Sequence, residues 1–512
     1  MSKIAKATLG LITVTMLSKV LGFFRELVLT YTHGASWVSD AYITSVGIPT
    51  ILFASIASAL GTTFIPLFYQ VDNEYDREKS LDFANNVFNI IILLSLILSV
   101  LGFVFAEPLV KIFAMNFDGE KLKITVEFTK IMIFGLVFIG LNNIMSSWLQ
   151  INGKFVITGI TGLPYNIIIM IGIALSSRGN LKLMAIATLI AMGSKFFVLL
   201  PYAIKCGYRY RFYINLKDDN IKKMIYLVIP VFIGSGVNQL NSIIDRSLAS
   251  TLGDGFITVL NSANRLNSFV LGLFISTIAS VIYPTLSKLA DEKNRVRFVE
   301  SVTKCINSII ILLIPISVGA IVLSEPVVKI VFEHGEFTQE ASSMTAIALV
   351  CYSIGMIGFG LRDVLGKVFY SLQDTKTPMI NGAIAMCLNI ILNIIFINIW
   401  GYVGLALATS ISSIVCILIL LSSLKKNIGY FGQDIIFRTF IKVISASIVM
   451  GIFSRYIYSN AMILLGSGFI SELIALMSSV SAGVIVYGML ISICGIEEVN
   501  VIIKLIKNKI RL

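Results

Sequence analysis

The feature that most constrains this chain is a series of long apolar segments, each close to or above the roughly 20 residues that a helix needs to cross a membrane. About fourteen can be distinguished by this length criterion. They lie near residues 7–31, 37–70, 81–105, 123–150, 155–176, 182–204, 221–250, 256–287, 298–323, 339–370, 377–397, 401–424, 436–458 and 469–493. The pattern predicts an all-α polytopic membrane protein.

The amino-acid composition excludes several classes of protein. The 512 residues are 56% hydrophobic and only 13% charged, with a mean hydropathy of +0.90, whereas about a quarter of an ordinary soluble domain is charged. A soluble enzyme, a disordered chain and a nucleic-acid-binding module are therefore excluded. We also find no phosphate-binding loop, metalloprotease motif or nucleophile elbow. The sequence predicts no enzyme activity, no cofactor and no metal site.

The 40 Lys and Arg residues, against 28 acids, predict the topology. If the spans alternate from the N-terminus, about 25 of these cations fall in loops on the N-terminal side and about 7 on the other side. Positive loops face the cytoplasm, so both termini are expected there, which requires an even number of spans. The basic loops at 205–223 and 288–304 are too short for an ATPase domain. An ion gradient, the membrane potential or a substrate gradient must then supply the energy.

An internal repeat organises the chain. The heptapeptide AEPLVKI at 106–112 recurs as SEPVVKI at 324–330, an offset of 218, and Asn166 corresponds to Asn389 at a similar offset. The repeat predicts two parallel six-helix lobes, with a substrate site between them near the membrane midplane and alternating access by rocking. A duplication that only enlarges a scaffold is the alternative. The predicted parts are an N-lobe at 1–220, a C-lobe at 221–430, and a helix pair with a basic cytoplasmic tail at 431–512.

About eight of the cations lie within the predicted spans, where a charge costs roughly 2.5–3.5 kcal/mol even on the mildest scale, and three of them are candidates for binding a ligand. They are Lys19, Arg25 and Arg265. Arg265 has no acid within a turn or two in its own helix, and a guanidinium matches phosphate oxygens bidentately. The set predicts an anionic ligand. The alternative is an interhelical ion pair with Asp40 or Glu26 that locks one conformation.

Asp245 stands beside Arg246 in the seventh predicted span. A local structural pair and a role in ion or proton coupling both remain open for this acid. Asp40 opens the second span, where a carboxylate suits the positive end of a helix.

Several motifs carry a family resemblance. They are SKVLGFFRE at 18–26, followed by Gly34 and DAY at 40–42; NRL at 264–266; EHGEFT at 333–338; and FYSLQDTKTP at 369–378. In these motifs the chain resembles the MurJ (MviN) family of bacterial flippases for lipid II, the undecaprenyl-pyrophosphate-linked peptidoglycan precursor. The likeness runs from the N-terminus to about residue 430.

The resemblance implies the multidrug/oligosaccharidyl-lipid/polysaccharide exporter fold in the bacterial cytoplasmic membrane. It implies two lobes around a cavity, with two C-terminal helices beside a groove for the lipid tail. It also implies that Lys19, Arg25 and Arg265 lie where the family binds the pyrophosphate, with Lys19 replacing an Arg. Glu26 and Asp40 match acidic family positions with gating or charge-pairing roles, and Asp245 matches a position where some members place a sodium ligand.

The chain departs from the family pattern at Phe53 and Ser58, where an Arg pair and an acid are usual, and at Ser268, where an acid is usual. These departures bear on the identity of the head group. The expected partners are a lipid-linked anionic glycan, membrane lipids, and sodium ions or protons for coupling, without nucleic acid; the oligomeric state stays open. A flippase for another undecaprenyl-linked glycan and a non-transporting scaffold in a cell-wall complex are the alternatives.

Overall fold

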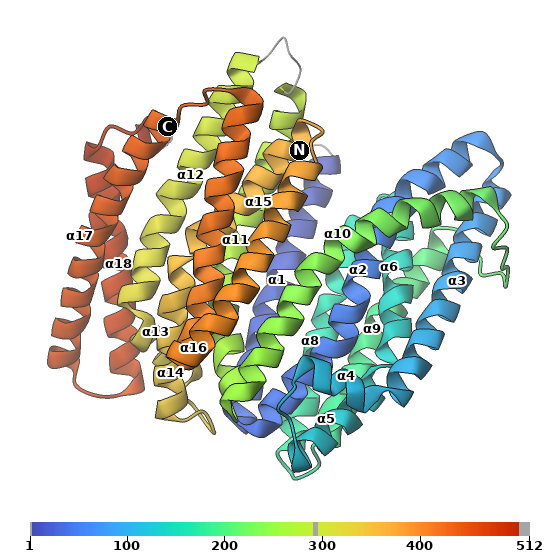
Figure 1. Ribbon diagram of the computed structural model, residues 1–512, viewed down its shortest axis with the longest axis horizontal. Coiled ribbons are helices and arrows are strands. Elements are labelled where there is room, and N and C mark those ends of the chain that lie inside the picture. The colour runs from blue at the N-terminus through green and yellow to red at the C-terminus, as the bar shows by residue number, and fades with distance from the viewer. Residues whose placement is uncertain (1–2, 290–294, 501–512) are drawn as a thin grey trace. The chain divides into compact units, whose positions relative to one another are not determined.

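The computed structural model describes residues 3–289 and 295–500, and helices are the only regular structure within these ranges (Figure 1). The described residues pack into two compact units. Unit 1 is formed by Met1–Thr258 with the short segment His334–Phe337, and unit 2 by Val259–Glu333 with Thr338–Leu512. The all-helical fold predicted from the apolar segments is confirmed.

Unit 1 contains the first ten α-helices and one 3₁₀ turn. They are α1 (Lys3–His33), α2 (Trp37–Glu74), α3 (Arg77–Val104), α4 (Ala106–Phe113), α5 (Gly119–Met132), α6 (Gly135–Ile151), α7 (Phe155–Ile160), α8 (Gly162–Ser176), α9 (Lys182–Lys205), α10 (Asp219–Ala249) and η1 (Ser250–Leu252). Helix α10 packs along α2. The predicted C-lobe begins with this helix, but its contacts place it in unit 1.

The core of unit 1 includes aromatic side chains from α2, α6 and the segment after α9. Phe68 meets Trp148 edge to face with ring centroids 5.4 Å apart, and Trp148 meets Tyr208 in the same way at 5.3 Å. Phe53, fully buried on α2, lies against the backbone of Gly140, where a Cβ atom would come within 3.2 Å of its ring. The first of the three departures from the family pattern is therefore a core residue. The side chain of Ser58 lies outside the described residues.

A polar stripe on α3 fixes the segment between α9 and α10. Asn85, Asn86 and Asn89 are buried, and each carboxamide bonds the segment at 208–215 through both its oxygen and its nitrogen. Asn86, for example, donates to the carbonyl of Asn215 and accepts from its N–H, both at 2.9 Å. The extended segment thus satisfies several of its backbone groups without joining a helix or a sheet.

Unit 2 contains the remaining helices. They are α11 (Phe256–Leu289), whose first turn belongs to unit 1, α12 (Arg295–Val322), α13 (Ser324–Phe332), α14 (Gln339–Ile354), α15 (Met356–Ser371), α16 (Lys376–Ile428), α17 (Gln433–Leu465) and α18 (Phe469–Ile493). Gly401 interrupts α16 with a non-helical backbone, φ 57° and ψ −130°. This helix therefore consists of two helical segments that meet at a glycine, as the predicted spans at 377–397 and 401–424 require.

Polar contacts among apolar side chains connect the C-terminal helices α17 and α18 to the rest of unit 2. Lys329 on α13 pairs with Glu472 on α18, whose side chain is only 10% exposed. The hydroxyl of Tyr487 donates to the carbonyl of Ile311 on α12 at 2.7 Å. The predicted basic tail of this part, Lys504–Arg511, lies outside the described residues.

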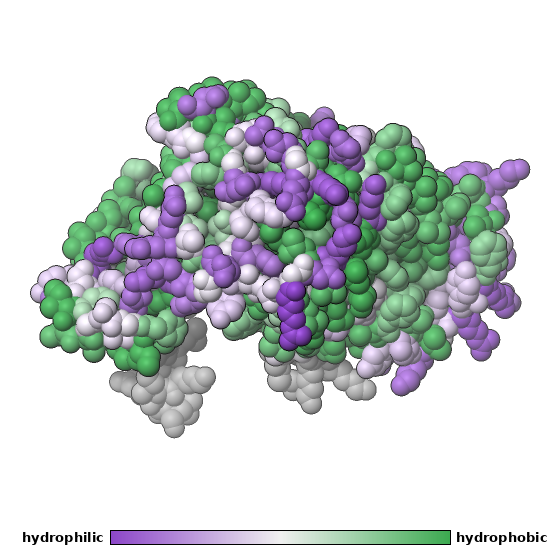
Figure 2. Space-filling view, turned by 90° about the horizontal axis from the view of Figure 1, so that it is seen from below, coloured by the Kyte–Doolittle hydropathy of each residue, from purple (hydrophilic) through white to green (hydrophobic). Residues whose placement is uncertain are grey.

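Within the described residues, nine helices are long and apolar enough to cross a membrane, or ten if the bent pair α14–α15 is one span. The predicted fourteen is consistent with these helices, because α16 divides at Gly401 and α1, α10 and α11 also match predicted spans. Hydrophobic side chains cover much of the face drawn in Figure 2 (green), and α3, α17 and α18 carry many large exposed hydrophobic residues. Such a surface suits a lipid environment and not water.

Candidate functional site

Arg25 lies on α1 in a fixed position within unit 1. Its Nη1 donates to Oδ1 of Asn166 on α8 at 3.2 Å, and its Cζ lies 5.7 Å from the centroid of the Tyr165 ring. Asn166 is held in turn by the carbonyls of Ser18 at 3.2 Å and Gly162 at 2.8 Å. The predicted ligand-binding arginine therefore has its guanidinium oriented by an amide and an aromatic face, with further donor groups left over.

Lys195, which the sequence analysis did not single out, shares this ring. Its Nζ lies 3.8 Å from the Tyr165 centroid, so two cations from different helices, α1 and α9, contact one aromatic side chain. The signal was present in the sequence. Lys195 interrupts an apolar span, and the criterion that selected Arg265 selects it equally.

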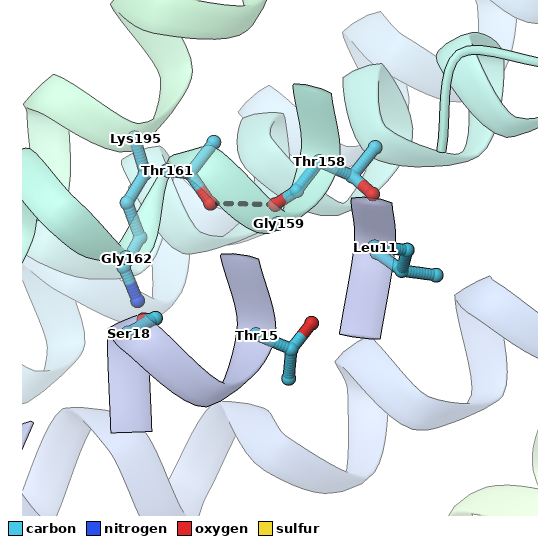
Figure 3. A pocket seen from close by; sticks show the side chains of 8 residues that line it. All are labelled: Leu11, Thr15, Ser18, Thr158, Gly159, Thr161, Gly162 and Lys195. Atoms are coloured by element: carbon cyan, nitrogen blue, oxygen red, sulfur yellow. Dashed lines mark hydrogen bonds between the residues drawn. The ribbon is translucent and has the colours of Figure 1, made fainter. Parts of the chain in front are cut away.

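A pocket of about 350 Å³ opens beside this cluster, between α1, the junction of α7 and α8, and α9. Figure 3 shows the Lys195 side chain reaching from α9 toward Ser18 on α1. Thr15 lies below the pocket, and Thr158 and Thr161 form the wall of the α7–α8 junction (Figure 3). The pocket thus has an ammonium group at one end and four hydroxyl groups around it.

Lys19 and Glu26 flank Arg25 on α1. Lys19 is exposed, whereas Glu26 is buried at 4% exposure. Both have electrostatic or hydrogen-bonding partners in the molecule. Glu26 is buried next to Arg25 in the sequence. Its carboxylate partly offsets the positive charge that a bound anion would otherwise have to balance.

Asp40 is the centre of a second polar site, which we call the Asp40 clamp. Its fully buried carboxylate accepts from the backbone N–H of Gly255 at 2.7 Å and of Thr258 at 2.9 Å, and from the Thr258 hydroxyl at 2.7 Å. Lys121 on α5 adds an ammonium at 3.2 Å and also pairs with the exposed Asp254 at 2.8 Å. The clamp joins the start of α2 to the start of α11 and to α5.

Close backbone contacts surround the clamp at the turn between α1 and α2. The N–H of Glu336 donates to the carbonyl of Tyr31 at 3.0 Å. A Cβ atom at Gly335 would come within 2.2 Å of that carbonyl oxygen, and one at Gly34 within 2.2 Å of the Glu336 oxygen. Both glycines have φ of 61°, which side chains disfavour. Only glycine permits this approach, so the segment 334–337 fits against the α1–α2 turn by backbone contact.

Arg265 and Asp245 lie on separate helices. Arg265 is an exposed residue of α11 in unit 2, and Ser268, the third departure, donates to Asn264 one turn away at 3.4 Å. Asp245 is on α10 in unit 1 and accepts from the Asn241 amide at 3.1 Å. Each also has further contacts. The predicted set of three cations is thus divided between the two units, and its joint role stays a prediction.

Arg246, the neighbour of Asp245, reaches the second span. Its Nη1 donates to the carbonyl of Ile43 on α2 at 3.4 Å, over Gly47, where a Cβ atom would clash with the guanidinium. The residue therefore helps to hold α10 on α2. In the part of the chain that the structure describes, no group of three or more His, Cys, Asp or Glu residues could hold a metal ion.

Comparisons with known proteins identify the family. The sequence model of the family described as "Lipid II flippase MurJ" matches residues 29–477. A probable lipid II flippase MurJ of Vibrio cholerae is 31% identical over 425 residues, 80% of this chain and 81% of that protein. The corresponding protein of Thermotoga maritima is 27% identical over 98% of each chain.

Comparison with solved structures supports the same family. A structure described as "Lipid II flippase MurJ, inward closed conformation" matches with a TM-score of 0.81 and 29% identity, covering 94% of this chain and 98% of that one. An inward-facing multidrug transporter of the MOP superfamily matches with a TM-score of 0.68 at 13% identity and shares the fold. This chain is a multi-pass membrane protein and belongs to the MurJ family.

Proposed function

We propose that this chain moves lipid II from the cytoplasmic to the outer leaflet of the bacterial cytoplasmic membrane. The likeness over residues 29–477 carries the proposal. The site supports it, because an oriented guanidinium within a membrane span suits a pyrophosphate that leaves the aqueous phase as the lipid crosses the membrane. Flipping needs no covalent chemistry, and we propose no catalytic residue.

The topology that we propose has both termini in the cytoplasm and two lobes, 1–220 and 221–430, followed by the pair in 431–512. The order of elements supports the lobes. Helix α3 is followed at once by the short α4, and α12 by the short α13, each short helix having a Glu in its first turn and a Lys in its last. Rocking of the two lobes then gives alternating access.

In the proposed cycle, Lys19, Arg25 and Arg265 bind the pyrophosphate while the polyprenyl tail stays in the lipid. Binding neutralises cations that repel one another, which lowers the free energy of a closed cavity. Glu26, buried next to Arg25, limits the net charge of the empty site. Release on the outer side restores the repulsion and resets the transporter.

The Asp40 clamp is the proposed outer gate. With a cytoplasmic N-terminus, the turn between α1 and α2 is on the outer side of the membrane, and so are the contacts of Asp40 with Gly255, Thr258 and Lys121. A sealed outer end is the arrangement needed to load substrate from the cytoplasm. Asp245 is the proposed site for sodium or proton coupling, with Asn241 as a neutral neighbour that donates to it.

Complementation tests the proposal. The gene should restore growth to a bacterium depleted of its only lipid II flippase, and Arg25→Ala should abolish rescue at equal protein level. Lys205→Ala, which removes an exposed cation from the end of α9, is the matched control and should rescue fully. If the unmodified chain does not rescue, or if Arg25→Ala rescues as well as the control, the proposal is wrong.

A further inference from the structure

The pocket beside Tyr165 has walls from four helices of unit 1, α1, α7, α8 and α9. Leu11, Thr15 and Ser18 are spaced so that they share one face of α1. The opposite wall is the break between α7 and α8, where Pro164 cannot donate to the carbonyl four residues earlier. Lys195 closes the end of the pocket. These residues come from rigid helical elements, which position a binding group more precisely than loops do.

Helices α1 and α8 pack closely at this wall. At Gly162 a Cβ atom would come within 1.8 Å of the Ser18 hydroxyl, so the helices approach through glycine. The Thr158 hydroxyl donates to the carbonyl of Phe155 at 2.6 Å and the Thr161 hydroxyl to that of Thr158 at 2.9 Å. Their oxygen lone pairs remain able to accept hydrogen bonds.

The chemistry of the lining defines the kind of ligand. The hydroxyl groups of the α7–α8 junction can accept, those of α1 can donate and accept, the ammonium of Lys195 can only donate, and no carboxylate is among the residues that line the pocket. A group rich in hydroxyls that also has carbonyl or carboxylate oxygens complements this set. The volume of about 350 Å³ lies in the range of sites for small organic molecules, so it accommodates more than a single phosphate.

Tyr165 relates this pocket to the pyrophosphate site, because Lys195 and Arg25 both contact its ring. A ligand whose pyrophosphate binds Arg25 would bring the group next to that pyrophosphate toward Lys195. We infer that the pocket formed by α1, the α7–α8 junction and Lys195 is a saccharide subsite, which binds the sugar attached to the lipid pyrophosphate. This inference rests on the proposed function. It adds which part of the lipid head group the pocket recognises.

Equilibrium binding by the purified full-length chain tests the inference with two probes. One is undecaprenyl pyrophosphate, which has no sugar, and the other is lipid II. Lys195→Ala should weaken lipid II binding about tenfold, as expected for hydrogen bonds to a charged group. Thr15→Val, which keeps the shape of the side chain, should weaken it about threefold. Both variants should bind undecaprenyl pyrophosphate as the unmodified chain does.

Two further variants make the result decisive. Lys205→Ala on the same helix should change neither affinity, and Arg25→Ala should weaken both probes. Equal weakening of both probes by Lys195→Ala would assign Lys195 to the pyrophosphate site and overturn the saccharide subsite, as would unchanged lipid II binding in Lys195→Ala and Thr15→Val. If the unmodified chain binds neither probe, the proposed function itself fails.

Discussion

Replacing Asp40 with Asn should open the gate that the clamp closes. The carboxylate receives four donors, two on each oxygen: Gly255 N–H and Lys121 on one, and the N–H and hydroxyl of Thr258 on the other. An asparagine keeps one oxygen and turns an NH₂ group toward the other pair of donors. Two hydrogen bonds are lost and donors face one another in a buried site.

The magnitude follows from the burial of Asp40, which is 0% exposed. Loss of one partner from a buried charge pair costs about 3–5 kcal/mol. If this cost is borne by the closed state alone, the equilibrium between closed and open gate shifts by at least about a hundredfold. Asp254→Asn is the matched control, because Asp254 pairs with the same Lys121 but is 64% exposed, and such pairs contribute at most about 1 kcal/mol.

Amide hydrogen exchange measures the shift directly, since the N–H groups of Gly255 and Thr258 are themselves donors to Asp40. Exchange in the peptide 250–260 should rise about a hundredfold in Asp40→Asn and change little in Asp254→Asn. If the two variants exchange at the same rate, the clamp does not hold the gate and the reasoning is refuted.

Three other perturbations test parts of the fold. Asn86→Ala removes two hydrogen bonds to the segment between α9 and α10 and should speed tryptic cleavage there; an unchanged rate would contradict its fixing role. Gly335→Ala should lower the Tm because of its φ of 61° and a clash at 2.2 Å, whereas Gly319→Ala, in open helical space, should not; equal effects would refute the close contact. Hydrogen bonds from Thr377 hold the pKa of Asp374 below its usual value, so its contribution to stability is present above the unfolded pKa and lost as the pH falls through the folded pKa. The Tm difference between the chain and Asp374→Asn should close on acidification, and a constant difference would be contrary evidence.

The sequence was sufficient for the helical membrane class, because segments of about 20 apolar residues have few other folds available. It was also sufficient to single out Arg25, since a charge within such a segment needs a partner, and Asp40, since a carboxylate suits the start of a helix. The structure supplies Asn166 and Tyr165 for the first and two backbone amides for the second. The same criterion also selects Lys195, which was not among the predicted site residues.

Other features could not have been read from the chain. The three asparagines of α3 look like an ordinary polar patch until the segment at 208–215 is seen to bond them across more than a hundred residues. The same is true of Gly34 and Gly335. A glycine in a loop sequence does not reveal that another backbone lies within contact distance, because that contact depends on packing between distant segments.

The proposed function requires that this chain flips lipid II without another protein. Reconstituted vesicles that contain the purified protein and fluorescent lipid II test it most directly, because no other protein is present. Labelled head groups should become accessible on the opposite leaflet, Arg25→Ala should abolish this movement, and Lys205→Ala should not. Vesicles in which lipid II stays in its original leaflet, or in which Arg25→Ala flips it at the unmodified rate, would show that the proposed function is wrong.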